Sequence, residues 1–169
     1  FSYSNLSLSD LSNAILKNTI FKSAILDKVD LSKADMGRAN LFGASIKNGK
    51  LMNVNLSNAF MKAANLSGAD LTGANLSKAK LSTANLEGAN LTNANLNKAN
   101  LTRNIIRVNL KGANLTGASF IGANLKGANL SGANLTGANF TDSNLKKTKL
   151  DNVTYCRTIK PKGERNDDC

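Results

Sequence analysis

The residues with the most distinctive chemistry are two cysteines, Cys156 and Cys169, which both lie in the last fourteen residues of the chain. A Lys-Pro-Lys-Gly segment at 160–163 stands between them and is typical of a turn. This arrangement predicts a disulfide that closes the tail; two unpaired thiols in a polar tail are the alternative. The wide spacing differs from the short C-x-x-C spacing of redox centres. We therefore expect the pair to staple the tail and not to catalyse a redox reaction.

Other catalytic chemistry has no residues to support it. The chain has no His, which excludes an imidazole general base, a Ser-His or Cys-His nucleophile pair and a His metal ligand. No paired carboxylates and no metal-ligand cluster can be assembled from the spacing. We therefore expect a protein that is not an enzyme and that binds no cofactor or metal. No run approaches the roughly 20 apolar residues that a membrane span needs.

The dominant pattern is an apolar residue at every fifth position, from Leu6 to Leu101 and again from Leu110 to Tyr155. Thirty positions keep this phase and twenty-three of them are Leu; each is called a centre below. The residue two before a centre is always small, and the residue directly before it is usually Asn or Asp. A period of five fits neither a helix nor a strand. Such strict phase also argues against a disordered low-complexity tract.

A solenoid with four short sides per coil accounts for this period, because each pentapeptide then supplies one side and one corner. We expect each centre and the small residue two before it to point inward, and the other three to point outward. Ten of the thirteen glycines stand two residues after a centre, which suits a corner that needs positive φ. Asn or Asp before the centre can bond to the turn backbone. Phe120 and Phe140, twenty residues apart, should stack in adjacent coils.

These A-N-L-x-x and A-D-L-x-x repeats resemble those of the pentapeptide-repeat proteins. The resemblance implies an all-β fold, a right-handed quadrilateral β-helix of about eight coils, over residues 1–155, followed by a disulfide-closed tail at 156–169. The tail resembles the C-terminal extension of secreted members from cyanobacteria and chloroplast thylakoid lumens. It implies a protein exported to the thylakoid lumen or the periplasm. The start at Phe1 without a Met indicates that a preceding segment was removed, either a signal peptide or a segment left out in cloning.

The phase breaks once. Leu101 and Leu110 are nine residues apart, where two repeats would take ten. We interpret this as the loss of one residue, with Ile105 or Ile106 as the intervening centre, absorbed by a local kink. The alternative is a re-aimed surface that presents Arg103 and Arg107 to an anionic partner.

Apolar residues also occupy sites that should face outward, directly before a centre. They are Ile15, Ile20, Ile25 and Phe60. Exposed apolar groups need a cover or a partner. We expect the N-terminal segment 1–3 to fold over this end as a flap, and a partner surface is the alternative.

The net charge of +11 bears on the partner. Lys78 and Lys98 should stack in one corner as a candidate interaction surface, against the alternative of an ordinary solvated surface. Nucleic acid should bind only nonspecifically, because proteins that read nucleic acid add exposed aromatics or an element that enters a groove.

We expect a structural or protein-interaction scaffold with an unknown protein partner. We expect it to be a monomer, with an end-to-end dimer as the alternative. The alternative function is a topoisomerase-binding DNA mimic like the quinolone-resistance members, which the positive charge disfavours.

Overall fold

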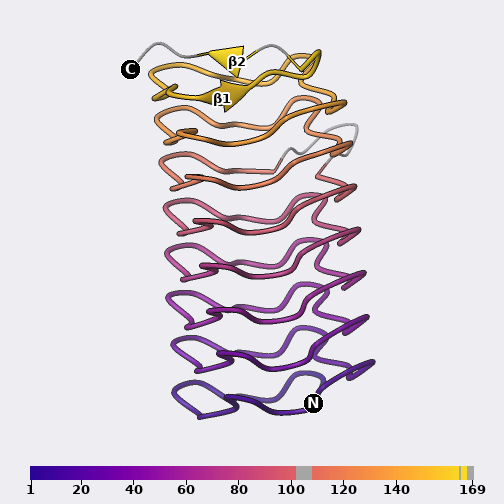
Figure 1. The fold of residues 1–169 in the computed structure, drawn as a ribbon. Helices are drawn as coiled ribbons and strands as arrows, with labels where there is room; N and C mark the ends of the chain where they lie inside the picture. The colour runs from indigo at the N-terminus through magenta and orange to yellow at the C-terminus, as the bar shows by residue number, and fades with distance from the viewer. Residues whose placement is uncertain (102–107, 164, 167–169) are drawn as a thin grey trace.

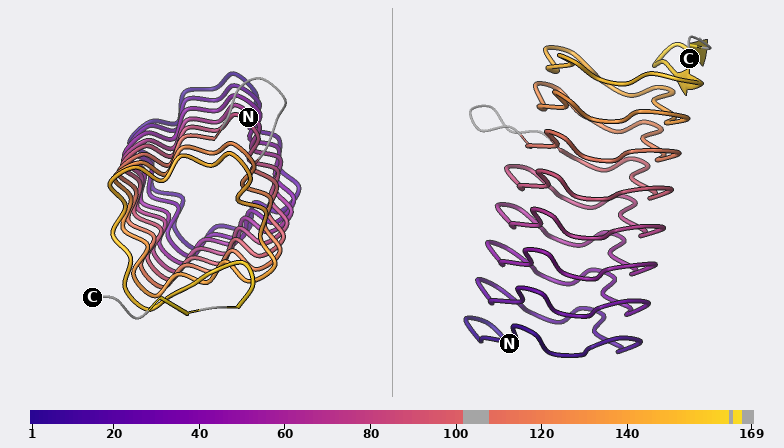
Figure 2. Two further views of the ribbon diagram at one scale, coloured as in Figure 1. Left: turned by 90° about the horizontal axis from the view of Figure 1, so that it is seen from above. Right: turned by 90° about the vertical axis from the view of Figure 1, so that its left-hand side faces the viewer.

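The structure, a computed structural model, describes residues 1–101, 108–163 and 165–166. The chain winds into coils that stack along one axis (Figure 1). Seen along that axis, each coil is roughly four-sided (Figure 2). Parallel pairing along one side joins eight successive positions, which confirms the expected number of coils: Asn5, Ile25, Ser45, Asn65, Asn85, Asn109, Asn129 and Lys149.

The interior is a column of alternating large and small apolar side chains. Centres such as Leu76 are fully buried, and the small residues two before them, such as Ala74, are buried with them. This confirms the predicted inward positions. The rings of Phe120 and Phe140 stack in adjacent coils with their centroids 4.8 Å apart, as expected. Burial of this apolar column stabilises the fold and offsets the conformational entropy lost when the chain is ordered.

Every backbone N–H of a typical repeat has an acceptor, which explains the consensus. In residues 76–80, two N–H groups reach the next coil, from Leu76 to the carbonyl of Asn95 at 2.7 Å and from Lys78 to that of Asn97 at 2.9 Å. The N–H of Lys80 donates to the previous coil, and that of Ala79 closes the corner turn. The N–H of Ser77 donates at 3.1 Å to Oδ1 of Asn75, the residue before the centre. Asn is thus the acceptor that the backbone cannot supply.

The corners explain the glycines. In every described corner between a centre and the next small residue, φ is positive two residues after the centre, for example 65° at Gly88 and 60° at Ala63. The following small residue donates its N–H to the carbonyl of the centre, from Ala89 to Leu86 at 3.1 Å. Positive φ at this position alone, with that hydrogen bond, defines a type II turn. Glycine adopts it without strain, which confirms the expected role.

The phase break is an insertion and not the expected deletion. Pairing before it advances by twenty residues per coil, but Asn85 pairs with Asn109 and Asn100 with Asn124, twenty-four residues later. Leu101 and Leu110 therefore belong to consecutive sides, and six residues connect Leu101 to Val108 where two suffice at other corners. The physical reason is that the backbone pairing on all four sides stays in register only if the four additional residues are confined to one corner. The predicted centre at Ile105 or Ile106 lies outside the described residues.

The coil also runs further than the expected boundary at residue 155. Ile159 pairs with Asn139, and the N–H of Asp142 donates to the carbonyl of Pro161 at 2.8 Å. The backbone ladder continues because Thr158 fills the small interior site. Strand β1 (Thr158–Ile159) then pairs antiparallel with β2 (Arg165–Asn166). The expected turn at 160–163 lies between them, closed by a 2.9 Å bond from the N–H of Gly163 to the carbonyl of Lys160.

Candidate interaction surfaces

One side of the solenoid and its two flanking corners carry most of the excess positive charge. This basic face consists of residues 17–23, 37–43, 57–63, 77–83, 97–101, 121–127 and 141–147, which the pairing register stacks above one another. It holds ten cations, Lys17, Lys22, Arg38, Lys62, Lys78, Lys80, Lys98, Lys126, Lys146 and Lys147, and one acid, Asp142. The other positions in residues 1–157, outside the face and outside 102–107, hold seven cations and seven acids.

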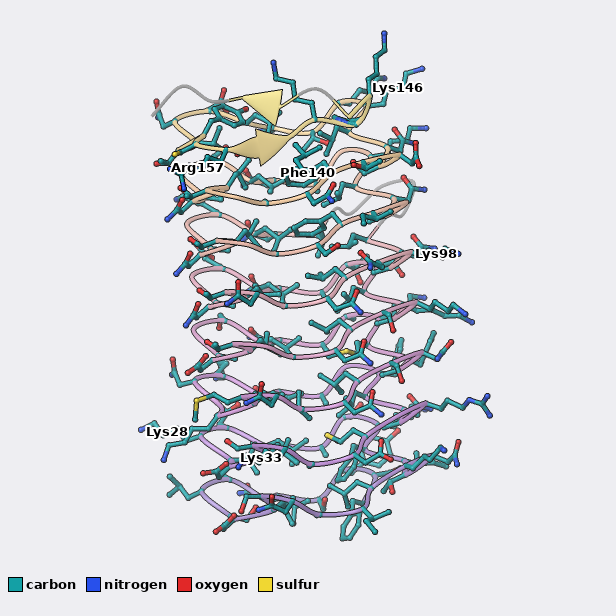
Figure 3. The ribbon with its side chains drawn as sticks, viewed as in Figure 1. Lys28, Lys33, Lys98, Phe140, Lys146 and Arg157 are labelled. Atoms are coloured by element: carbon teal, nitrogen blue, oxygen red, sulfur yellow. The ribbon has the colours of Figure 1, made fainter. Side chains whose placement is uncertain are left out.

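The side-chain view shows this segregation directly. Lys98 and Lys146 project at one edge of the rod, whereas Lys28, Lys33 and Arg157 lie toward the opposite edge (Figure 3). The two ion pairs among the described residues, Lys47–Asp27 at 3.2 Å and Lys50–Asp30 at 3.9 Å, both lie off the basic face. None of the ten cations has an acidic partner within the described part of the chain.

Two of the four sequence-predicted basic residues, Lys78 and Lys98, fall on this face. Lys78 and Lys98 occupy the same corner of adjacent coils, since the N–H of Lys78 donates to the carbonyl of Asn97. Arg103 and Arg107 lie outside the described residues. Sequence reasoning missed the face itself, because charge was compared along the chain and not around the coil. Sorting residues by side would have found it, but only with the correct register across residues 102–107.

The predicted apolar sites differ in their surroundings. Ile15, Ile20 and Ile25 are 87%, 53% and 45% exposed, so the expected flap is wrong: Phe1 instead stacks on Phe21, with ring centroids 5.3 Å apart, as part of the first coil. Phe1 joins the coil because the five-residue phase extends to residue 1, which makes Phe1 a centre. Phe60 is partly covered by stacking with Phe42 at 6.0 Å.

Ile15, Ile20 and Ile25 also leave one backbone N–H each without the side-chain acceptor that Asn or Asp would provide. Where Asn or Asp stands at this site, it accepts from the backbone N–H two residues later, as Asn40 does from Phe42 at 3.1 Å. Ile cannot accept, and within the described residues no group accepts from the N–H of Lys17, Lys22 or Asp27. Their presence is therefore not explained by the stability of the coil.

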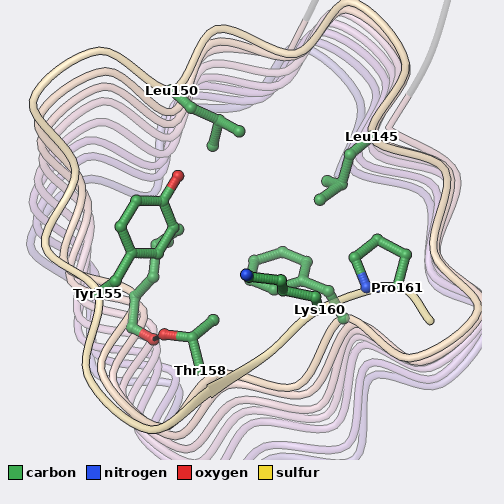
Figure 4. Close-up of a pocket in the computed structure, with 8 residues that line it drawn as sticks. Leu145, Leu150, Tyr155, Thr158, Lys160 and Pro161 are labelled. Atoms are coloured by element: carbon green, nitrogen blue, oxygen red, sulfur yellow. Dashed lines mark hydrogen bonds between the residues drawn. The ribbon is translucent and has the colours of Figure 1, made fainter. Parts of the chain in front are cut away.

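The C-terminal end of the rod is hollow. A cavity of about 400 Å³ lies above the last complete coil, lined mainly by apolar side chains and also by Thr158 and Lys160, whose side chain extends toward the middle of the cavity (Figure 4). Leu145, Leu150 and Tyr155 line it because no coil stacks on them. Burial raises the pKa of the Tyr155 hydroxyl. Cys156 is not a free thiol, while Cys169 lies outside the described residues, so the pairing of the two remains a prediction.

Two carboxylates, those of Asp10 and Asp30, accept hydrogen bonds from the backbone. The backbone N–H of Ser12 donates to the Asp10 carboxylate and lowers its pKa, and the N–H of Ser32 does the same for Asp30. Among the described residues no three His, Cys, Asp or Glu side chains are grouped to hold a metal ion. Residues 1–101, 108–163 and 165–166 contain no helix with the length and hydrophobicity of a membrane span.

Comparison with solved structures finds similar folds. HetL, a pentapeptide repeat protein involved in heterocyst differentiation regulation in the cyanobacterium Nostoc sp. strain PCC 7120, is 31% identical, with a TM-score of 0.66 over 98% of this chain and 82% of that chain. The fluoroquinolone resistance protein QnrB1, trypsin-treated, is 20% identical, with a TM-score of 0.56 over 90% of each chain. A pentapeptide repeat protein from the Arabidopsis thaliana thylakoid lumen is 30% identical over 71% of this chain and 67% of that one, with a TM-score of 0.32.

No curated protein sequence matches the chain. The family model of pentapeptide repeats matches in eight copies, over residues 4–43, 50–88, 69–105, 81–121, 104–142 and 118–154. The fold is accordingly the right-handed quadrilateral β-helix that the repeats predict. The chain belongs to the pentapeptide-repeat family.

Proposed function

We propose that the protein is a non-enzymatic scaffold that binds a protein partner on its outer surface. The observation that carries this proposal is the composition of the interior. From Phe21 to Phe140 the described centres and small sites are apolar and buried, so this part of the interior offers no site where a substrate could meet reactive groups. Function is therefore assigned to the surfaces outside this column. The likeness to HetL, a protein involved in regulation, supports a role in interaction.

The exposed isoleucines are the proposed contact with that partner. Ile15, Ile20 and Ile25 present apolar surface and give up hydrogen bonds that the fold would otherwise gain. Placing a photo-crosslinking amino acid at Ile15, in cells of the source organism, should trap a discrete partner. The control is the same amino acid at Thr116, in an outer corner of a later coil. Identical products at both positions would overturn the assignment.

We further propose that the protein works in an oxidising compartment outside the cytosol, the thylakoid lumen or the periplasm. The support is Cys156, which is not free. Disulfides persist mainly in oxidising compartments. Thiol titration of the unfolded, unreduced protein should find no free thiol. Two titratable thiols would remove the argument for export.

The second candidate, a DNA mimic that binds topoisomerase, is disfavoured by charge. The likeness to QnrB1, at 20% identity, shows the fold alone. A DNA mimic needs negative charge along the rod, whereas this rod presents a continuous basic face, and the DNA-binding surface of a topoisomerase is itself basic. A gyrase supercoiling assay should show no inhibition at micromolar protein. Inhibition at a salt concentration that prevents the protein from coating DNA would favour the mimic.

A further inference from the structure

We propose that the basic face is a docking surface for an anionic lipid bilayer. This goes beyond the proposed protein scaffold, and either can fail without the other. The first step is the arrangement of charge. Ten cations share one side and its two flanking corners with a single acid, and cations in adjacent coils, such as Lys78 and Lys98, are separated by a coil spacing of roughly 4.8 Å, within the Debye length of about 8 Å at physiological salt. Their fields therefore add instead of being screened separately.

The second step is the shape of this face. It runs along the described coils of a stack that follows one axis (Figure 1), and the hollow lies at the C-terminal end of the rod and not on this side. Proteins that hold single strands of nucleic acid combine a basic groove with aromatic platforms, and readers of duplex DNA insert an element into a groove. A side that extends along the stack matches an extended partner, and a bilayer surface spans the whole length of the rod.

The third step is the kind of side chain. Nine of the ten cations are Lys, which acts as a point charge, whereas Arg dominates specific bidentate recognition of phosphates. Apolar groups stand among them near the N-terminal end, where Ile20 is 53% exposed. Lys62 lies over the ring of Phe42, its Nζ 5.7 Å from the centroid. Lysines with neighbouring aromatic and aliphatic groups are the composition of surfaces that lie on membranes.

Cosedimentation with vesicles tests the proposal on the full chain. The probes are vesicles of phosphatidylcholine with 30% phosphatidylglycerol and vesicles of phosphatidylcholine alone. The protein should bind the first and not the second, and 500 mM salt should release it. Charged residues near an anionic surface contribute enough that a triple variant, Lys78→Gln, Lys80→Gln and Lys98→Gln, should bind roughly a hundredfold more weakly.

The matched control is Lys28→Gln, Lys33→Gln and Lys111→Gln. It changes the net charge equally, and each triple contains two lysines at positive φ. All three control lysines are exposed and lie off the basic face. Circular dichroism checks that both variants fold. The loss of vesicle affinity in the control variant should be less than a tenth of the loss in the basic-face variant.

Three outcomes would overturn the proposal. One is equal loss of vesicle binding in both triple variants, which would mean that net charge alone matters. Another is the absence of binding to phosphatidylglycerol vesicles at low salt. The last is tighter binding of a 20-nucleotide single strand or duplex than of vesicles, with loss in the basic-face triple only, which would assign the surface to nucleic acid.

Discussion

Asn100 pairs with Asn124, twenty-four residues further along the chain, although the pairing before it advances by twenty. The four surplus residues fall between Leu101 and Val108. Because these four residues are confined to one corner, each of the four sides before the corner stays aligned with the corresponding side after it. Lys126 and Lys146 therefore continue the face that Lys98 and the earlier lysines begin.

The interior should not tolerate a larger side chain at the small sites. Ala128 is fully buried, between the centres Leu125 and Leu130. Ala128→Leu should lower the free energy of unfolding by about 1–3 kcal/mol, because overpacking forces neighbouring side chains from their preferred rotamers. Thermal unfolding measures this. Lys126→Leu, at an exposed corner site of the same coil, is the control and should have little effect; equal losses would contradict the assignment of inside and outside.

Adding a glycine at a corner and removing one should change the free energy of unfolding in opposite directions. Ala63 has a φ of 60°, so Ala63→Gly should raise the free energy of unfolding by about 0.5–1 kcal/mol through relief of left-handed strain. Gly88→Ala should lower it by about 1 kcal/mol, because a Cβ there meets no atom within 4 Å and the loss is purely one of backbone conformation. Chemical denaturation compares the two. Destabilisation by Ala63→Gly would contradict the turn type.

A buried hydroxyl offers a stabilising substitution. Ser143 occupies a small interior site, and its Oγ has no hydrogen-bond partner, so Ser143→Ala should raise Tm by removing an unsatisfied polar group worth about 1 kcal/mol or more. At an equivalent site, the hydroxyl of Thr158 donates to the carbonyl of Leu135 at 2.8 Å. Thr158→Val keeps the volume and should lower Tm. A fall in Tm with Ser143→Ala would show that its hydroxyl is satisfied.

Asp27 should make stability depend on pH. Burial raises the pKa of its carboxyl, but hydrogen bonds from the Ser45 hydroxyl at 2.6 Å and from the Lys47 N–H at 3.0 Å outweigh burial, and the net shift is downward from 3.8. A group whose pKa is lowered by folding stabilises the protein fully above its ordinary pKa and loses that contribution as pH falls through the folded value. Stability should therefore decline below about pH 4.

Two variants isolate this contribution. Asp27→Asn keeps an acceptor without the charge, as Asn97 does in accepting from Ser119 and Ile121, and should make the acid limb of the stability profile shallower. Asp27→Ala should cost about 1–3 kcal/mol at pH 7, because the groups that donate to it lose their acceptor. A wild-type acid limb in Asp27→Asn would assign the pH dependence elsewhere.

The fold was predictable from the sequence because one period fixes which residues point inward. Leu76, Ala74 and the corner Gly88 all take the predicted positions. The register across residues 102–107 was not predictable, since in a five-residue phase the loss of one residue and the gain of four are the same shift. The basic face depends on that register, so Lys78 and Lys98 were predicted to stack while the alignment with Lys126 was missed. The exposure of Ile15 was missed because Phe1 continues the repeat instead of forming a flap.

The central claim is that one continuous register aligns both halves of the rod, and spin labels measure it directly. Thr92 and Thr116 should be neighbours in adjacent coils, because the N–H of Asn93 donates to the carbonyl of Thr116 at 2.8 Å. Labels at Thr92→Cys and Thr116→Cys should show strong dipolar broadening, as expected for neighbouring coils about 5 Å apart. Labels at Thr92→Cys and Lys111→Cys should show weak broadening. The reverse would mean that a residue was lost, that the two halves are offset by one corner, and that the basic face is not continuous.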